Sequence, residues 1–79
     1  MLDLKKMLCD IVSPIVDDPS AISITESEVE ADNILLELSV APDDMGKVIG
    51  KHGRIAKAIR TVLKAAANAE GKKVTVDIK

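Results

Sequence analysis

The residues best suited to chemistry form the short motif Gly50-Lys51-His52-Gly53, in which two glycines flank a lysine and a histidine. Glycine lets the backbone turn tightly and lets a ligand approach the main chain without meeting a Cβ atom. If a helix begins directly after Gly53, its free amides and the positive end of its dipole favour an anion there. Lys51 and His52 would add side-chain donors. The motif therefore predicts a clamp for phosphate groups.

Basic residues surround this motif. Between Lys47 and Lys64 the chain carries six Lys and Arg side chains and no acid. Residues 47–79 hold nine basic and two acidic side chains, whereas residues 1–46 hold two basic and eleven acidic ones, an asymmetry that the net charge of −2 conceals. Such a division indicates a polyanion partner on one face, and we expect the Asp and Glu of residues 17–44 to form a solvated acidic surface.

Several residue types that other functions require are missing. The chain has no Phe, Tyr or Trp, which excludes the aromatic platforms on which RRM, OB and cold-shock domains stack bases. His52 is the only histidine and Cys9 the only cysteine, so neither a His pair, an internal disulfide nor a thiolate metal site is expected. We expect Cys9 to fill the core, and we expect no catalytic residue, metal, cofactor or small-molecule substrate.

The first half of the chain predicts one helix and a hairpin. Apolar residues recur at helical spacing from about Asp3 to Val16, although Pro14 should kink or end this helix nearby. Alternation predicts a strand from Ile22 to Val29, a turn at Glu30–Asn33, and a second strand from Ile34 to Val40.

The second half predicts two helices and a last strand. A short helix should begin at Pro42, where Asp43 and Asp44 complement its positive end, and finish at Gly50. The helix after Gly53 has an expected core face made of Ile55, Ile59, Val62, Leu63 and Ala66, with Lys57, Arg60 and Lys64 on the opposite side. Gly71 is its expected C-cap, and residues 74–78 alternate as a strand.

These elements define the expected fold class. The order α-β-β-α-α-β gives an α+β domain, residues 1–79, with a three-stranded sheet packed on one side by helices. No apolar run reaches the roughly 20 residues of a membrane span, and the first residues enter a helical pattern without a signal segment. We therefore expect a cytoplasmic protein with no membrane partner.

At this point the sequence resembles a known family. The run from Val48 to Arg60 is similar to the core of a KH domain, whose GxxG loop clamps about four nucleotides of backbone. Two strands before the loop and one after it match the type II KH topology, as in the Era GTPase. Residues 41–54 resemble the signature of small bacterial stand-alone KH proteins, the KhpA (YlqC) family. Ala56 departs from many KH domains, which carry Ile or Val there, and Ile55 and Ile59 are expected to fill the core instead.

The resemblance implies a function and a set of partners. It implies a single-stranded RNA-binding protein, an RNA chaperone that acts as a homodimer or with a larger Jag-type RNA-binding protein, in post-transcriptional regulation linked to cell elongation and cell-wall homeostasis. The implied RNA-binding residues are Gly46, Lys47, Ile49, Gly50, Lys51, His52, Gly53, Arg54 and Lys57.

Alternatives remain open. The chain could be a protein-interaction subunit that uses a KH-like fold for dimerisation and binds little RNA. Single-stranded DNA could replace RNA, because many backbone contacts do not distinguish the sugars. Gly46 could be an incidental helix glycine, and Ile49 could belong to the core, contact bases, or do both.

Overall fold

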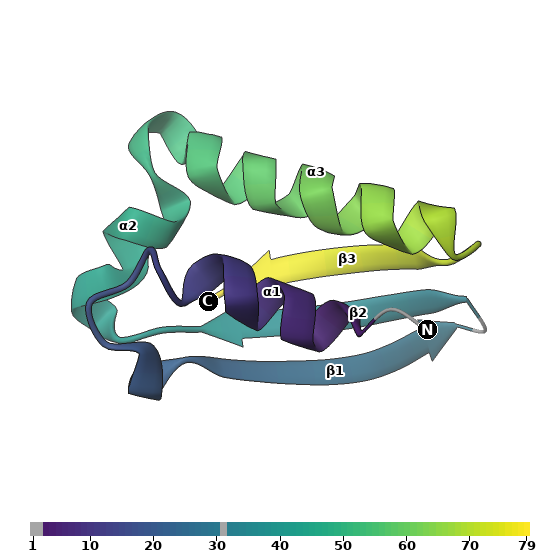
Figure 1. Ribbon diagram of the computed structural model, residues 1–79, viewed down its shortest axis with the longest axis horizontal. Helices are drawn as coiled ribbons and strands as arrows, with labels where there is room; N and C mark the ends of the chain where they lie inside the picture. The colour runs from purple at the N-terminus through teal and green to yellow at the C-terminus, as the bar shows by residue number, and fades with distance from the viewer. Residues whose placement is uncertain (1–2, 31) are drawn as a thin grey trace.

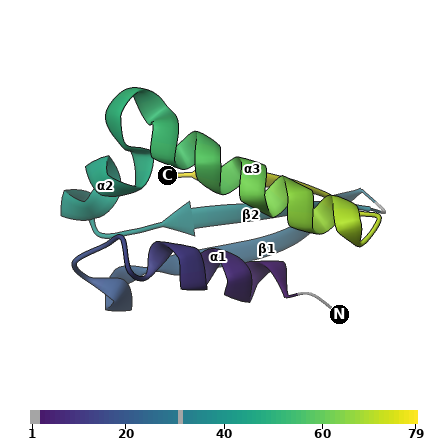
Figure 2. The same ribbon diagram turned by 45° about the horizontal axis from the view of Figure 1, so that its top comes forward.

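A computed structural model describes residues 3–30 and 32–79. Three helices cover one face of a three-stranded sheet (Figures 1 and 2). In chain order the elements are α1 (Leu4–Val12), β1 (Ser23–Glu30), β2 (Asn33–Ser39), α2 (Met45–Ile49), α3 (Arg54–Ala69) and β3 (Lys73–Ile78), with short 3-10 turns at Pro19–Ala21, Pro42–Asp44 and Lys51–Gly53. The expected element order and the single helical layer are confirmed.

The sheet has the order β1-β2-β3, with β2 in the centre. β1 and β2 are antiparallel, whereas β2 and β3 are parallel and register Leu36 with Val76. The parallel pair requires a crossover connection, which contains α2, the glycine motif and α3. The turn expected at Glu30–Asn33 is too wide, because Glu30 and Asn33 pair within the ladder; Ala31, also assigned to it, lies outside the described residues.

The core lies between the sheet and the helices. Alternate residues of β2 and β3 face it, and the largest fully buried apolar side chains are Leu8, Val12, Leu36, Leu38, Val48 and Leu63. Burying an aliphatic side chain of this size contributes about 1.5–3 kcal/mol. The core therefore fixes the position of α2 and α3, between which the glycine motif lies.

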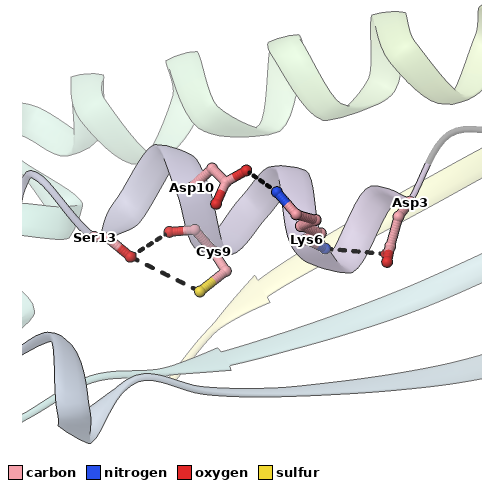
Figure 3. Close-up of polar contacts among 5 residues, drawn as sticks. All are labelled: Asp3, Lys6, Cys9, Asp10 and Ser13. Atoms are coloured by element: carbon pink, nitrogen blue, oxygen red, sulfur yellow. Dashed lines mark hydrogen bonds and ion pairs between the residues drawn. The ribbon is translucent and has the colours of Figure 1, made fainter.

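α1 is shorter than its apolar periodicity predicts. Asp3 caps it by accepting a hydrogen bond from the Lys6 amide at 3.1 Å, and Lys6 also pairs with Asp10 at 2.9 Å (Figure 3). The helix ends at Val12, and the Ser13 amide and hydroxyl both donate to the Cys9 carbonyl. Pro14 has no amide proton to continue the ladder, so the expected end of the helix near it is confirmed, while Val16 lies beyond the helix.

α3 confirms Ile59 and Leu63 of the expected core face, with Ala66 partly buried against it, but not Ile55 and Val62. Its buried residues are Ala56, Ile59, Leu63 and Ala67, whereas Ile55 and Val62 are 38% and 49% exposed. The apolar arc of α3 is wider than the strip that the fold covers, and the small Ala56 and Ala67 side chains lie on the covered side. Placing Ile55 and Val62 in the core was therefore wrong, and Ala56 is a core residue.

The end of α3 agrees with the sequence. Gly71 has a φ of +71°, and its amide donates to the Asn68 carbonyl at 3.0 Å. The Lys72 amide donates to the Ala67 carbonyl at 2.9 Å. This is the hydrogen-bonding pattern of a Schellman cap, which glycine favours because it adopts a positive φ without strain. The expected C-cap is confirmed.

Candidate nucleic-acid interface

The glycine motif forms a tight turn at the junction of α2 and α3 (Figure 1). Gly50, His52 and Gly53 have φ values of +74°, +58° and +72°. Gly50 combines its φ with a ψ of 176°, a region that only glycine adopts readily. A Cβ atom on Gly50 would also lie 2.6 Å from Ile55 Cγ1, so Ile55 leaves no room for a side chain. At Gly53 the backbone conformation alone favours glycine, because no atom lies within 4 Å of its Cβ position.

The side chains of this turn are available to a ligand. Lys51 and His52 are exposed, as are Arg54 and Lys57 on the first turns of α3. Within the part of the chain that the structure describes, Lys51 and His52 make no side-chain hydrogen bond or ion pair. Among the described residues, His52 is the one non-glycine residue with a positive φ. Its backbone is therefore not helical, and its side chain belongs to the loop and not to α2 or α3.

Two backbone amides expected to be free are already used. The Gly53 amide donates to the Gly50 carbonyl at 3.2 Å, and the Arg54 amide donates to the Lys51 carbonyl. The turn thus satisfies donors that the sequence assigned to a bound anion. The side chains of Lys51 and His52 are left as the more direct donors to a phosphate group.

Asp44, expected on the solvated acidic surface, is buried instead, with 2% of its surface exposed. Its two carboxylate oxygens accept hydrogen bonds from the amides of Asp17 and Asp18, each at 3.1 Å. These hydrogen bonds, led by that from Asp17, and the nearby ammonium of Lys47 lower the pKa of Asp44 below its ordinary value. Asp44 therefore ties the segment after α1 to the start of α2.

Lys47 belongs to the same junction. Its ammonium pairs with the Asp17 carboxylate and lies 3.7 Å from Asp44 Oδ1. The Asp17 carboxylate, followed by that of Asp44, raises the pKa of Lys47 above its ordinary value. Lys47 is half-exposed, and these acids partly neutralise its charge. The other basic residues expected in the site have no such partners among the described residues.

Arg60 reveals which flank of α3 faces the sheet edge. Its Nε donates to the Val76 carbonyl at 3.2 Å. The amides of Lys73 and Lys79 donate to carbonyls on the β2 side of β3. Because the backbone groups of successive strand residues point to opposite edges, the carbonyl of Val76 points to the other, free edge of β3. Lys57 and Lys64 lie one turn on either side of Arg60 along α3. Sequence reasoning placed all three on the solvent side and had no signal for the contact across to β3.

Apolar side chains lie close to the loop as well. Ile49 and Ile55, at the two ends of the turn, are 39% and 38% exposed. They offer an apolar surface beside the cations, which a sugar or base edge could cover. Gly46 is exposed, and a Cβ atom there would meet nothing within 4 Å, so sterics alone do not require glycine at that position.

No group of three or more His, Cys, Asp or Glu side chains among the described residues is arranged to hold a metal ion. Within the same residues, no helix has the length and apolar character needed to span a bilayer.

Comparisons with known proteins agree on one family. The KH domain described as KhpA/KhpB matches residues 5–78. The RNA-binding protein KhpA of Clostridium acetobutylicum is 56% identical over 75 residues, which cover 95% of this chain and 99% of that protein. KhpA of Clostridium perfringens is 55% identical over the same shares of both chains, and KhpA of Listeria monocytogenes serovar 1/2a is 43% identical over 95% of this chain and 97% of that protein.

Solved structures agree on the fold. Era in complex with MgGDPNP and nucleotides 1506–1542 of 16S ribosomal RNA matches with a TM-score of 0.62 at 19% identity, over 98% of this chain and 30% of Era. Era from Aquifex aeolicus, bound to GDP and aluminium fluoride, matches with a TM-score of 0.61 at 21% identity, over 99% of this chain and 31% of that one. The fold, the family match and the full-length relatives together show that this chain belongs to the KhpA/KhpB family of KH-domain proteins.

Proposed function

We propose that this chain is a non-catalytic module that binds single-stranded RNA by its sugar-phosphate backbone, with the loop Gly50–Gly53 as the clamp. One observation carries the proposal. Lys51 and His52 stand exposed on a turn of positive φ between α2 and α3, inside a stretch of basic residues without an acid. The names of the relatives support RNA as the ligand, as does the RNA bound in one Era structure of similar fold.

Each part of the loop has a role in this proposal. Gly50 and Gly53 give the turn its shape, and Lys51 and His52 contact a phosphate as cation and hydrogen-bond donor. Arg54 and Lys57 extend the positive surface along α3. Ile49 and Ile55 cover a sugar or base edge without reading it. Because the chain has no aromatic platform, each clamp binds weakly and with loose sequence preference, as suits an RNA chaperone.

The direct test is the double variant Lys51→Asp with His52→Asp. Both side chains are exposed, so the melting temperature should stay within about 3 °C of the parent, since exposed substitutions change stability by roughly 0.5 kcal/mol or less. Two negative charges then face the RNA backbone. After screening by salt, the affinity for single-stranded RNA should fall about tenfold to a hundredfold.

A matched control carries the same change in net charge outside the loop. Lys5→Asp with Ser23→Asp alters two exposed positions on α1 and β1 and should leave RNA affinity within about threefold of the parent. If the loop variant melts like the parent and binds RNA equally well, the clamp assignment is wrong. Single-stranded DNA of the same sequence, measured in parallel, decides whether the sugar matters.

We also propose that the protein pairs, either with itself or with a larger Jag-type RNA-binding protein. Val62 on α3 and Val29 on β1 leave apolar surface exposed outside the loop, which favours a protein contact, and pairing two clamps raises the effective concentration on one RNA. Sedimentation at tens of micromolar should show a species heavier than the 8.4 kDa chain. A strict monomer would remove the homodimer and leave only the heteromer.

The alternative is a protein-interaction subunit with little RNA binding, which the same exposed apolar residues favour. It predicts that the loop variant pairs normally and that the parent retains no RNA in a pull-down. For the cellular role, we propose action as one domain in the cytoplasm, in post-transcriptional regulation linked to cell elongation and cell-wall homeostasis. Crosslinking to RNA in cells, followed by sequencing, should recover transcripts of that kind.

A further inference from the structure

A second basic groove lies at the end of α3 far from the loop. It is open and has a volume of about 500 Å³. Its polar lining comes from α3, from β3 and the turn before it, and from the start of β2: Lys64, Asn68, Lys72, Lys73, Thr75 and Asn33. The rest of the lining is apolar, so the groove combines three ammonium groups with amides and a hydroxyl and includes no acid.

This groove lies on the same flank of α3 as Arg60. Lys57, Arg60 and Lys64 follow one another at intervals of three and four residues, which places them on one side of the helix. The contact between Arg60 and the Val76 carbonyl shows that this side faces the free edge of β3. At 1.5 Å per residue, Lys57 and Lys64 are about 10 Å apart along the axis. A basic track therefore connects the loop to the groove, along the line where α3 runs beside β3 (Figures 1 and 2).

The chemistry of the groove fits phosphate. In the described residues, no ion pair engages Lys64, Lys72 or Lys73, unlike Lys47. The amides of Asn33 and Asn68 and the Thr75 hydroxyl can donate to phosphate oxygens or to sugars. The basic flank of α3 leads from the proposed clamp to the groove, which favours a chain that reaches both over a separate small molecule.

We propose that single-stranded RNA held by the loop continues along the basic flank of α3 and makes a second backbone contact in the groove lined by Lys64, Lys72 and Lys73. The inference rests on the proposed function and adds to it a longer path. The footprint of one protomer then exceeds the roughly four nucleotides that a KH loop clamps.

The test compares two lengths of oligouridylate, about four and about ten nucleotides, chosen to fill the loop alone or both contacts. The parent should bind the longer RNA about fiftyfold more tightly, because three phosphate contacts at about fourfold each near 0.15 M salt exceed the roughly sevenfold gain that extra registers alone give a ten-nucleotide chain. The triple variant Lys64→Gln, Lys72→Gln and Lys73→Gln should lose most of that advantage and leave the affinity for the shorter RNA within about twofold. Losing three phosphate contacts should also reduce the salt slope of the longer RNA by about 2, at roughly 0.7 per contact.

A control and a second measurement keep the test specific. The variant Lys5→Gln, Lys6→Gln and Lys79→Gln removes the same charge elsewhere and should change neither affinity by more than about twofold. In an NMR titration of the parent, the longer RNA alone should shift the amides of Asn68, Lys73 and Thr75. Equal losses in the two triple variants, or equal parental affinity for both lengths, would overturn the second contact.

Failure of the proposed function has a different signature. The Lys51→Asp and His52→Asp variant would then bind the shorter RNA as the parent does, and the inference would fall with the clamp. If that variant loses the shorter RNA while the groove variant binds the longer RNA like the parent, the clamp stands and only the second contact is wrong.

Discussion

The two ends of α2 are built in opposite ways. At its start a side chain holds the structure in place. The buried Asp44 carboxylate accepts hydrogen bonds from the amides of Asp17 and Asp18, and Lys47 pairs with the acids there. At its end the backbone holds the structure in place, through the positive φ values of Gly50 and Gly53, and the charged side chains remain exposed.

The difference shows how charge is divided between structure and binding in a small domain. A buried charge is tolerated only where hydrogen bonds replace water, as they do around Asp44, and such a charge is no longer free to contact a ligand. A loop that is shaped by backbone conformation needs no side chain for its own geometry. Lys51 and His52 are therefore available for a ligand, whereas Lys47, only four residues earlier, is partly neutralised by acids of the fold.

The largest effect is expected from alanine at Gly50 compared with alanine at Gly53. Gly50→Ala meets both a glycine-only backbone region, at about 1–3 kcal/mol, and a clash with Ile55, at about another 1–3 kcal/mol. Thermal unfolding should show a loss of about 10–30 °C. Gly53→Ala meets only the positive φ, at about 1–2 kcal/mol, and should lose about 5–10 °C.

Ile55→Ala gives the matched test of the clash. It removes the Cγ1 atom that lies 2.6 Å from the Gly50 Cβ position but keeps the Cβ atom at 2.9 Å. In a double-mutant cycle it should recover part of the Gly50→Ala loss and none of the Gly53→Ala loss. Equal melting temperatures for the two glycine variants would show that Ile55 does not constrain the loop.

The other end of α2 should respond next most strongly. Asp44→Asn keeps the shape but loses one of the two hydrogen bonds from backbone amides, because its Nδ2 cannot accept, weakens the other and removes the charge that partners Lys47. The melting temperature should fall by about 5–10 °C, and the affinity of the folded protein for RNA should stay within about twofold. The control Asp43→Asn, at an exposed neighbouring position, should change neither the melting temperature nor the RNA affinity. If Asp44→Asn alone weakened RNA binding, the two ends of α2 would not have separate roles.

The contribution of the Asp44 carboxylate to stability should also depend on pH. The folded pKa of Asp44 lies below its ordinary value of 3.8, so the ionised form favours the fold and its contribution is fully present above about pH 4. That contribution disappears as the pH falls through the folded pKa. Chemical unfolding at several pH values should therefore show the gap between parent and Asp44→Asn closing below about pH 4, whereas a constant gap would mean that Asp44 titrates normally.

The smallest effect is expected at Lys47. Lys47→Gln should change RNA affinity by less than about twofold, because its ammonium already pairs with acids. Lys51→Gln should cost about fourfold near 0.15 M salt, the effect of losing one phosphate contact on a single strand. Equal losses, measured by fluorescence anisotropy, would place Lys47 in the RNA site after all.

The features that could be predicted correctly from the sequence are those that depend on local patterns. Alternation located β2 and β3, Pro14 marked the end of α1, and Gly71 marked the end of α3. The pairing of glycines with cations also pointed to the loop. Each of these features depends on residues a few positions apart, which is why the printed chain was enough to find them.

What the sequence did not predict depends on partners far along the chain. Asp44 is buried because amides 26 and 27 residues earlier bind it, and Arg60 turns to a carbonyl 16 residues later. The wide apolar arc of α3 could not reveal which part of it the fold would cover, so Ile55 and Val62 were assigned to the core in place of Ala56 and Ala67. Residue type alone does not show which acid is buried, which backbone group an arginine contacts or which apolar residues the fold covers.

The parallel pairing of β2 with β3 has a consequence for synthesis. The loop and the whole of α3 lie inside the crossover between these two strands, and β3 follows them in the chain. While the ribosome is still adding α3, the hairpin β1–β2 can form, but the strand against which Arg60 anchors has not yet been made. The loop is thus translated before the support for its flank exists. A nascent chain should acquire its proposed RNA-binding surface in one late step, when β3 leaves the exit tunnel.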